Sequence, residues 1–146
     1  MRATGVFRED EVAVALELFD APDAPGAPDG MGYRFVVAEL AGNVAGYACY
    51  GATPMTLGTW DLYWIAVDPA LHGRGVGTEL MRAVEDAIRA EQGRMVIIET
   101  ASKPSYDATR RFYARHPGCR EVARVPNFYS IGDDKVMYAI ELGGAR

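Results

Sequence analysis

Residues 61–77 read DLYWIAVDPALHGRGVG, a pattern that predicts a strand running into a glycine-rich loop. The first part of the stretch is largely apolar, with aromatic and β-branched side chains, which is typical of a central strand. A turn at Pro69 follows, and glycines then alternate with other residues at Gly73, Gly75 and Gly77. Such glycines let several backbone N–H groups point into one concavity, and the N-terminus of a following helix adds partial positive charge. The stretch therefore predicts an anion site that suits a pyrophosphate.

The residues from Val76 onward predict an amphipathic helix of about 15 residues that starts inside the glycine loop. Apolar side chains recur every four positions at Val76, Leu80, Val84 and Ile88, and charged residues lie between them. Gly93 is expected to end this helix. The strand, the glycine loop and the helix thus form one continuous unit.

Two well-known phosphate-binding loops do not match this unit. A P-loop needs Gly-Lys-Ser/Thr, whereas Thr78 and Glu79 follow Gly77. A dinucleotide-binding fingerprint read from Gly73 needs a third glycine where Thr78 stands, and no βαβ unit opens the chain. We therefore reject a P-loop NTPase and consider a Rossmann domain a weak match.

The remaining pattern predicts one mixed α/β domain over residues 1–146. Strands with hairpin turns precede the central unit, and a strand, a helix and two further strands follow it. The predicted elements are a helix over 9–19, a hairpin of 33–40 and 44–51, a strand over 95–100, a helix through Phe112 and Tyr113, strands near 120–125 and 135–142, and a loop between these last two.

Composition places the chain among ordinary globular proteins. Its 146 residues are 49% hydrophobic and 24% charged, which suits one domain with its own core. The chain has neither an apolar run of membrane-spanning length nor a signal-like N-terminus, so we expect a cytoplasmic protein that makes no membrane contact.

Charge and cysteine content exclude further classes of protein. The net charge is −5, and residues 1–30 carry the whole acidic excess, so we expect no nucleic-acid partner. Cys49, Cys119, His72 and His116 lie in separate segments without metal-ligand spacing, so we expect reduced, buried cysteines and no metal site.

The sequence His72-Gly73-Arg74-Gly75-Val76-Gly77 resembles the Gln/Arg-x-x-Gly-x-Gly/Ala motif of the GNAT superfamily of acyl-CoA-dependent N-acetyltransferases. Residues 109–113, TRRFY, resemble the segment of that family's fourth helix that ends in a tyrosine. Residues 132–142, GDDKVMYAIEL, resemble the last strand of one bacterial branch. His72 stands where Gln or Arg is usual, and Tyr106 stands where an Asn is frequent.

The resemblance covers residues 33–142 and implies a GNAT-like fold: a mostly antiparallel sheet of six or seven strands that splays open between two central parallel strands. It also implies that acetyl-CoA binds in the splay. Family members normally begin with a strand and a helix, and nothing before Phe7 matches that strand. We therefore expect the first strand to be missing.

The resemblance further implies which residues hold the coenzyme. The backbone of Ile65 and Val67 would bond the pantetheine as an added strand would. The pyrophosphate would lie on the amides of a continuous run, which comprises His72, Gly73, Arg74, Gly75, Val76 and Gly77. The side chains of His72 and Arg74 are candidates for phosphate contacts.

Catalysis requires a proton for the leaving thiolate and a base for the amine. The resemblance makes Tyr113 the general acid. Glu99 is our preferred base, with Asp61, Glu39 or a water chain as alternatives. Strand alternation is expected to place Asp61 on one face with Tyr63, Ile65 and Val67.

A loop before the last strand offers a second polar group. Asp133, Asp134 and Tyr129 lie there, and they suit either recognition of a cationic amine or a polar turn around Gly132. The residues alone leave these two interpretations open.

The function expected from the resemblance is an enzyme that moves an acetyl group from acetyl-CoA to a primary amine of a small molecule or peptide. The amine attacks directly in a ternary complex. The alternative is a non-catalytic acyl-CoA-binding or regulatory module of the same fold. A homodimer is also expected, because a missing strand would expose an edge of the sheet.

Overall fold

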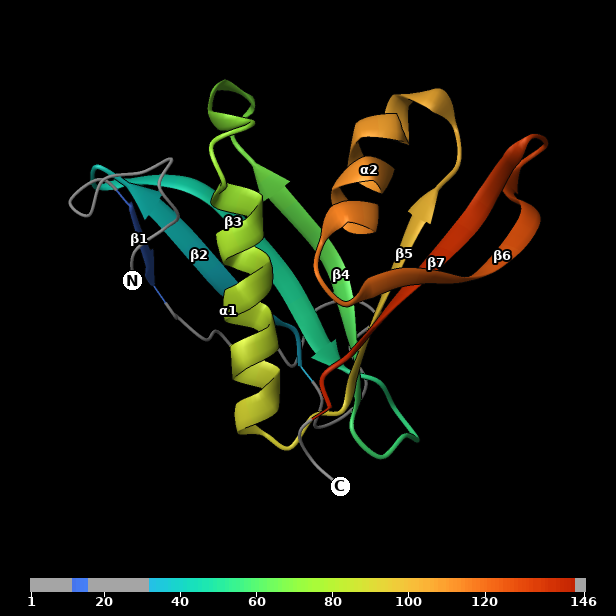
Figure 1. Cartoon of the computed structure of the whole chain (residues 1–146), viewed down its shortest axis with the longest axis horizontal. Coiled ribbons are helices and arrows are strands. Elements are labelled where there is room, and N and C mark those ends of the chain that lie inside the picture. Colours follow the sequence, from blue (N-terminus) through green and yellow to red (C-terminus); the bar gives the residue numbers. More distant parts are fainter. Residues whose placement is uncertain (1–11, 16–31, 144–146) are drawn as a thin grey trace.

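The computed structural model describes residues 12–15 and 32–143. Within them one sheet of seven strands has the order β1-β2-β3-β4-β5-β7-β6, and two α-helices pack against it (Figure 1). The acidic residues of the 1–30 segment lie outside the described residues. The strands are β1 (Val12–Ala15), β2 (Arg34–Leu40), β3 (Asn43–Ala52), β4 (Thr59–Val67), β5 (Met95–Ala101), β6 (Cys119–Ser130) and β7 (Asp133–Glu141); the helices are α1 (Val76–Ala90) and α2 (Asp107–Arg115), with short 3-10 turns η1 (Pro69–Leu71) and η2 (Pro104–Tyr106).

The sheet opens between its two central strands. All neighbouring strands pair antiparallel except β4 and β5, which are parallel. Their pairing covers only Thr59–Leu62 against Met95–Ile98, and beyond it the two strands diverge into a V (Figure 1). The splay that the family resemblance implied is therefore confirmed.

Helix α1 buries the apolar stripe that the sequence predicted. Val76, Leu80, Val84 and Ile88 are all at most 2% exposed and belong to the main core. The helix contacts β2, β3 and β4, and Gly93 donates its N–H to the carbonyl of Ile88 just after the helix ends. Burial of such side chains is worth roughly 1.5–3 kcal/mol each, so this stripe fixes α1 on the first half of the sheet.

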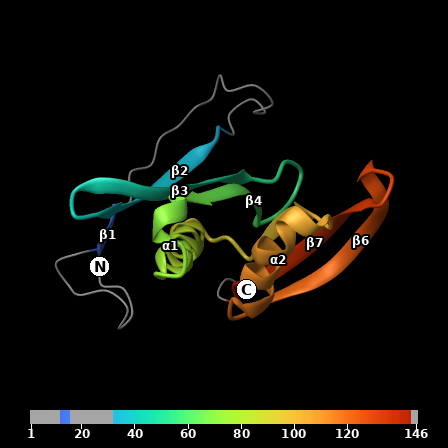
Figure 2. The same ribbon diagram turned by 90° about the horizontal axis from the view of Figure 1, so that it is seen from above.

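Helix α2 lies beside the second half of the sheet (Figure 2). It approaches α1 closely at two places. His116 Nε2 lies 2.5 Å from Glu85 Oε2 in a buried pair. A Cβ at Gly77 would lie 3.2 Å from the ring of Phe112, so a larger residue there would press on that ring. These contacts position the two arms of the V.

The N-terminal part of the sheet differs from the sequence-based expectation. Val12–Ala15 form strand β1, antiparallel to β2, so the predicted helix over 9–19 is wrong at these residues. The chain therefore has a short strand before the hairpin, where the first strand was expected to be missing. The apolar spacing was interpreted as a helix because a four-residue strand is too short to show the alternation of a strand clearly.

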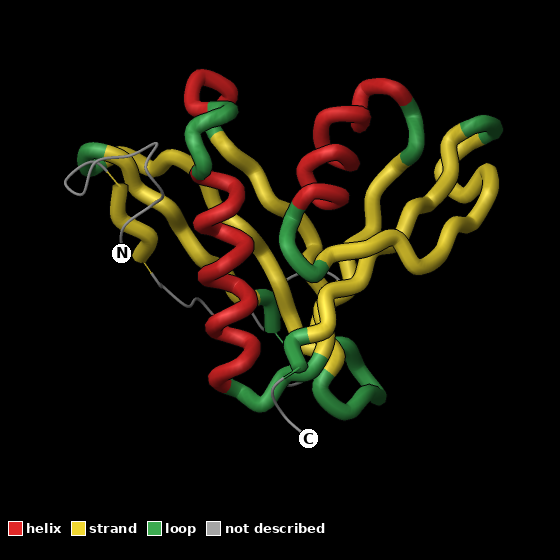
Figure 3. The backbone as a smooth tube through the Cα atoms, in the orientation of Figure 1, coloured by secondary structure: helices red, strands yellow, loops and turns green. Residues whose placement is uncertain are grey.

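The hairpin of β6 and β7 is longer than expected. The predicted loop after residue 125 is mostly strand, and the turn itself is at Ile131 and Gly132 (Figure 3). The pairing is irregular between Val125 and Ser130, where Asn127 has a φ of 57°. Pro126 and Asn127 are typical of loops, which explains the mistaken prediction.

None of the helices in the described ranges has the length and apolar character that a membrane crossing needs.

Candidate active site

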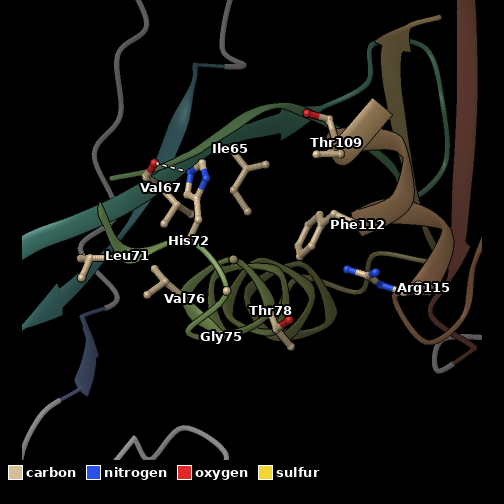
Figure 4. Close-up of a pocket in the computed structure, with 13 residues that line it drawn as sticks. Ile65, Val67, Leu71, His72, Gly75, Val76, Thr78, Thr109, Phe112 and Arg115 are labelled. Carbon is tan, nitrogen blue, oxygen red and sulfur yellow. Dashed lines mark hydrogen bonds between the residues drawn. The ribbon is translucent and has the colours of Figure 1, made fainter. Parts of the chain in front are cut away.

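A first cavity of about 440 Å³ lies between β4, the glycine loop and α2 (Figure 4). Its residues come mainly from one continuous stretch of chain and from one side of α2. They are Ile65, Val67, Leu71, His72, Gly73, Gly75, Val76, Gly77, Thr78, Ala108, Thr109, Phe112 and Arg115. Most of the residues expected to hold the coenzyme are therefore together.

The edge of β4 faces this cavity with backbone groups that β5 does not use. Asp68 donates its N–H to the carbonyl of Ala45 in β3. Because successive residues of a strand direct their backbone groups to opposite sides, those of Val67 and Ile65 point away from β3. The carbonyl of Val67 lies 3.1 Å from His72 Nε2, as the dashed line in Figure 4 marks. A ligand strand that pairs with this edge therefore competes with the imidazole for this carbonyl.

The glycine loop presents backbone amides at the start of α1. Gly73 and Gly75 have φ values of 80° and 85°, a conformation that favours glycine, and Gly75 caps the helix. Glu79 is the first residue whose N–H bonds within the helix, to the carbonyl of Gly75. The amides of the preceding first turn, including Gly77, have no intrahelical acceptor and suit an anion.

Not every predicted amide of this loop is free for a ligand. The N–H of His72 donates to Pro69 and that of Arg74 donates to Leu71, each at 3.3 Å. Arg74 does not line the cavity. Arg115 of α2 does, and it directs its guanidinium toward the space beside α1 (Figure 4). The sequence analysis missed this cation because α2 and the glycine loop meet only in the folded chain.

A second cavity, of about 480 Å³, lies farther along the splay. It shares Ile65 and Thr109 with the first cavity, so the two meet there. Its walls combine aromatic and charged side chains from separate elements. They are Tyr63, Trp64, Ile65, Glu99, Thr100, Ala101, Lys103, Tyr106, Thr109, Tyr113, Tyr129 and Asp133.

Tyr113 lines this second cavity from α2. Its side chain is largely buried and packs against the rings of Phe112 and Tyr138, at centroid distances of 5.5 and 5.6 Å. Burial raises the pKa of the Tyr113 hydroxyl well above its usual value, and Cys119 and Tyr138 add smaller contributions. The hydroxyl therefore keeps its proton at neutral pH.

Glu99 lines the same cavity from β5. Its carboxylate lies 3.3 Å from Lys135 Nζ, and its side chain is 43% exposed. Neither Asp61 nor Glu39, the other two candidate bases, lines either cavity. Of the three carboxylates, only Glu99 is in direct reach of a molecule in the splay.

A β-bulge at Tyr63 corrects the expected alternation along β4. Ala48 and Tyr50 of β3 face the same side of the sheet, and they pair with Ile65 and Leu62. Ile65 and Leu62 thus share a face although they are three residues apart, because Tyr63 is the extra residue of the bulge.

Asp61 consequently faces away from Ile65, contrary to the prediction that both share one face. Asp61 accepts a 2.8 Å hydrogen bond from Thr53 Oγ1. Burial raises its pKa, the Thr53 hydrogen bond lowers it, and the nearby Glu99 charge raises it. Sequence periodicity failed here because one inserted residue inverts every later side chain of a strand.

The aspartates near the β6–β7 turn accept hydrogen bonds from backbone N–H groups of neighbouring segments. Asp133 Oδ1 accepts hydrogen bonds from the N–H groups of Ser102 and Lys103. Asp134 Oδ1 accepts one from the N–H of Asn127 and does not line the second cavity. The structure thus favours the structural interpretation for both aspartates.

The cysteines match their predicted state. Cys49 and Cys119 are both free and buried, and burial raises their pKa values to about 12 and about 11. Among the described residues, no group of three or more His, Cys, Asp or Glu side chains could hold a metal ion.

Comparisons with known proteins point to one family. The sequence profile of the acetyltransferase (GNAT) family matches residues 7–118. A GNAT-family crystal structure from Desulfovibrio desulfuricans is 46% identical, with a TM-score of 0.74, over 77% of this chain and 70% of that one. Ard1 from Thermoplasma volcanium is 26% identical, with a TM-score of 0.63, over 73% and 69% of the two chains.

A more distant structure shares the fold. YncA from Salmonella typhimurium, solved with acetyl-CoA, is 23% identical, with a TM-score of 0.65, over 79% of this chain and 68% of that one. A search of curated proteins found no match.

Proposed function

We propose that this chain, which belongs to the acetyltransferase (GNAT) family, transfers an acetyl group from acetyl-CoA to a primary amine of a small molecule or peptide. One observation supports this proposal above all: two cavities with different lining residues meet at Ile65 and Thr109. The first offers backbone amides and the second offers Glu99 and Tyr113. The thioester carbon would lie where they meet.

In this proposal the first cavity takes the coenzyme. The pantetheine lies along the open edge of β4 and bonds the backbone of Ile65 and Val67. The pyrophosphate lies on the first-turn amides of α1, beside Arg115. Pairing with the Val67 carbonyl displaces the imidazole of His72, which is then free to turn toward a phosphate.

The second cavity takes the amine, which arrives mostly as an ammonium ion. Glu99 accepts its proton, directly or through a water, and the neutral nitrogen attacks the thioester carbonyl carbon. A C–N bond forms and the C–S bond breaks, and the nitrogen, which is positively charged after the attack, releases its second proton to the solvent. The proton on Tyr113 passes to the leaving sulfur, and the phenolate is reprotonated from the solvent, so that the products are the amide and free coenzyme A.

The raised pKa of Tyr113 shapes that last step. A hydroxyl with a raised pKa is intact at neutral pH but is a weaker acid than the thiol it protonates. Tyr113 therefore acts first as a hydrogen-bond donor to the developing charge on sulfur, and complete proton transfer follows late.

A panel of primary amines, assayed by release of free thiol from acetyl-CoA, tests the function. The two cysteine thiols of the protein give little background, because both are buried and have raised pKa values. Turnover with any amine supports the enzyme. Saturable binding of acetyl-CoA without turnover would instead support the non-catalytic acyl-CoA-binding module.

The homodimer expected from the sequence stays a prediction. β6 forms one edge of the sheet, but its pairing is irregular and its side chains include Arg120 and Arg124, features that protect an edge from pairing with another copy. Light scattering at tens of micromolar, roughly the usual assay range, distinguishes monomer from dimer.

A further inference from the structure

Aromatic side chains from four separate elements line the second cavity. Tyr63 and Trp64 come from β4, Tyr106 from η2, Tyr113 from α2 and Tyr129 from β6. Trp64, Tyr106 and Tyr129 are 41%, 38% and 47% exposed, although large aromatic side chains favour burial. Exposed rings gathered around one hollow are typical of a site whose ligand covers them.

The rings lie close to the carboxylate that faces the cavity. Burial raises the pKa of the Tyr129 hydroxyl, and the charges of Glu99 and Asp133 and the neighbouring Tyr106 raise it further, which shows that these groups are near one another. Tyr63 and Trp64 of β4 contact each other at a centroid distance of 6.4 Å. The cavity thus has an aromatic enclosure with a carboxylate at one side.

The charges around the cavity limit how many positive groups a ligand can carry. Asp133 is 7% exposed and its carboxylate already accepts two backbone N–H groups. Glu99 is 43% exposed, and Lys135 lies 3.3 Å away and balances its charge in part. Lys103 adds a positive charge to the lining. One accessible carboxylate suits one ammonium group, and the lysines oppose a polycation.

We propose that the acceptor is a small monoamine with an aromatic ring, an arylalkylamine, whose ring packs among Trp64, Tyr106 and Tyr129 while its nitrogen lies near Glu99. This inference rests on the proposed function and names its substrate class. The volume of about 480 Å³ falls within the range of small-molecule sites. Ring pairs of this kind favour an aromatic ligand beyond the area that it buries.

The first experiment compares four acceptors in the thiol-release assay: 2-phenylethylamine, n-hexylamine, spermidine and a short peptide with a free N-terminus. We expect kcat/KM for 2-phenylethylamine to exceed that for n-hexylamine by about tenfold, and that for spermidine by more. Equal use of the two monoamines, or preference for spermidine or the peptide, would overturn the inference while leaving the acetyltransferase in place.

The second experiment tests the rings themselves. Tyr129→Leu and, separately, Trp64→Leu should lower kcat/KM for 2-phenylethylamine about tenfold and leave the Kd of acetyl-CoA unchanged. Tyr47→Leu is the matched control, because Tyr47 is a strand tyrosine that is 36% exposed and lines neither cavity. Melting curves identify any variant that is merely unfolded. Unchanged discrimination in both folded variants would contradict the aromatic enclosure.

A calorimetric titration separates failure of this inference from failure of the proposed function. 2-Phenylethylamine is titrated into the protein saturated with coenzyme A. Binding that Tyr129→Leu weakens, without turnover of any amine, would reject the enzyme but keep the aromatic ligand site. Turnover of other amines without binding of 2-phenylethylamine would keep the enzyme and reject the aromatic ligand site.

Discussion

The two cavities are similar in volume, about 440 and 480 Å³, but they are built from different parts of the chain. The first is formed largely by one continuous stretch, from Ile65 to Thr78, which includes the glycine loop. The second is formed by residues that β4, β5, η2, α2, β6 and β7 bring together. Backbone amides recognise a phosphate in any member of a family, whereas side chains decide which acceptor fits.

The difference between the two cavities predicts which measured quantity a substitution in each should change. Changes in the first cavity should weaken coenzyme binding, and changes in the second should lower turnover while coenzyme binding stays the same. For the variants of Tyr113, Glu99 and Gly75, the Kd of acetyl-CoA and kcat are both to be measured, because a variant that changes both would contradict the division.

The largest effect is expected at Tyr113. Tyr113→Phe removes one hydroxyl and keeps the buried ring, so kcat should fall by about 10²–10⁴-fold while the Kd of acetyl-CoA changes only a few-fold. Tyr138→Phe is the matched control, because Tyr138 packs against Tyr113 but lines neither cavity. Full activity in Tyr113→Phe would leave water as the proton source.

The choice of base is the next test. Glu99→Gln should lower kcat by about 10²-fold, because Glu99 lines the second cavity. Asp61→Asn should leave kcat near normal, since Asp61 lines neither cavity. The pKa of Asp61 is raised, so the folded state holds its proton more tightly than the unfolded chain does.

The same Asp61 variant has a stability signature. The stabilisation that protonated Asp61 gives is lost as pH rises from the unfolded pKa of about 3.8 through the raised folded pKa. Above that window the charged, half-buried carboxylate is unfavourable, so Asp61→Asn should unfold at higher temperature than the wild type at pH 7. A pH series of melting curves measures this, and a lower melting temperature at pH 7 would contradict it.

Gly75 tests the first cavity. Acetyl-CoA at one hundred times its Kd should stabilise the wild type by about 2.7 kcal/mol, seen as a rise in melting temperature. Gly75→Glu places a bulky anion at the pyrophosphate site and should abolish that rise. Gly42→Glu, at a hairpin turn with a φ of 84° and open space around it, carries the same backbone strain away from both cavities. An equal rise in both variants would remove the glycine loop from the site.

The smallest effect is expected where the two arms of the V touch. Gly77→Ala should raise the free energy of unfolding by less than the roughly 1 kcal/mol that alanine usually adds in a helix. The reason is that the new Cβ would lie 3.2 Å from the Phe112 ring. In a Phe112→Leu background the same change should give the full gain. Urea unfolding of the wild type, the two single variants and the double variant measures the coupling energy between the two sites. Additive changes in the free energy of unfolding would show that the Cβ at position 77 does not strain the Phe112 ring.

The strand–loop–helix unit could be predicted from the sequence because its signals are local. The apolar run of β4, the glycines at 73, 75 and 77, and the four-residue spacing of Val76, Leu80, Val84 and Ile88 all lie within 30 residues and agree with one another. Glycine at a positive φ and an apolar helix stripe are requirements of the backbone and of burial, whatever surrounds them.

Other features depended on partners distant in the chain. The bulge at Tyr63 is defined only by the register between β3 and β4, and it reversed the predicted face of Asp61. Strand β1 exists because it pairs with β2, not because its four residues have a strand pattern. Arg115, Trp64 and Lys103 were not singled out, because nothing in their local sequence marks them.

The sequence by itself therefore determined the family, the central unit and the glycine loop at the start of α1, since each follows from neighbouring residues. Only the tertiary structure decided how far β4 and β5 stay paired, and so how wide the splay opens. That divergence after Leu62 and Ile98 places Glu99, Tyr113 and Tyr129 around one cavity. The physical reason is that a cavity is made by groups that are close in space, and closeness in space across a sheet is set by strand register and packing.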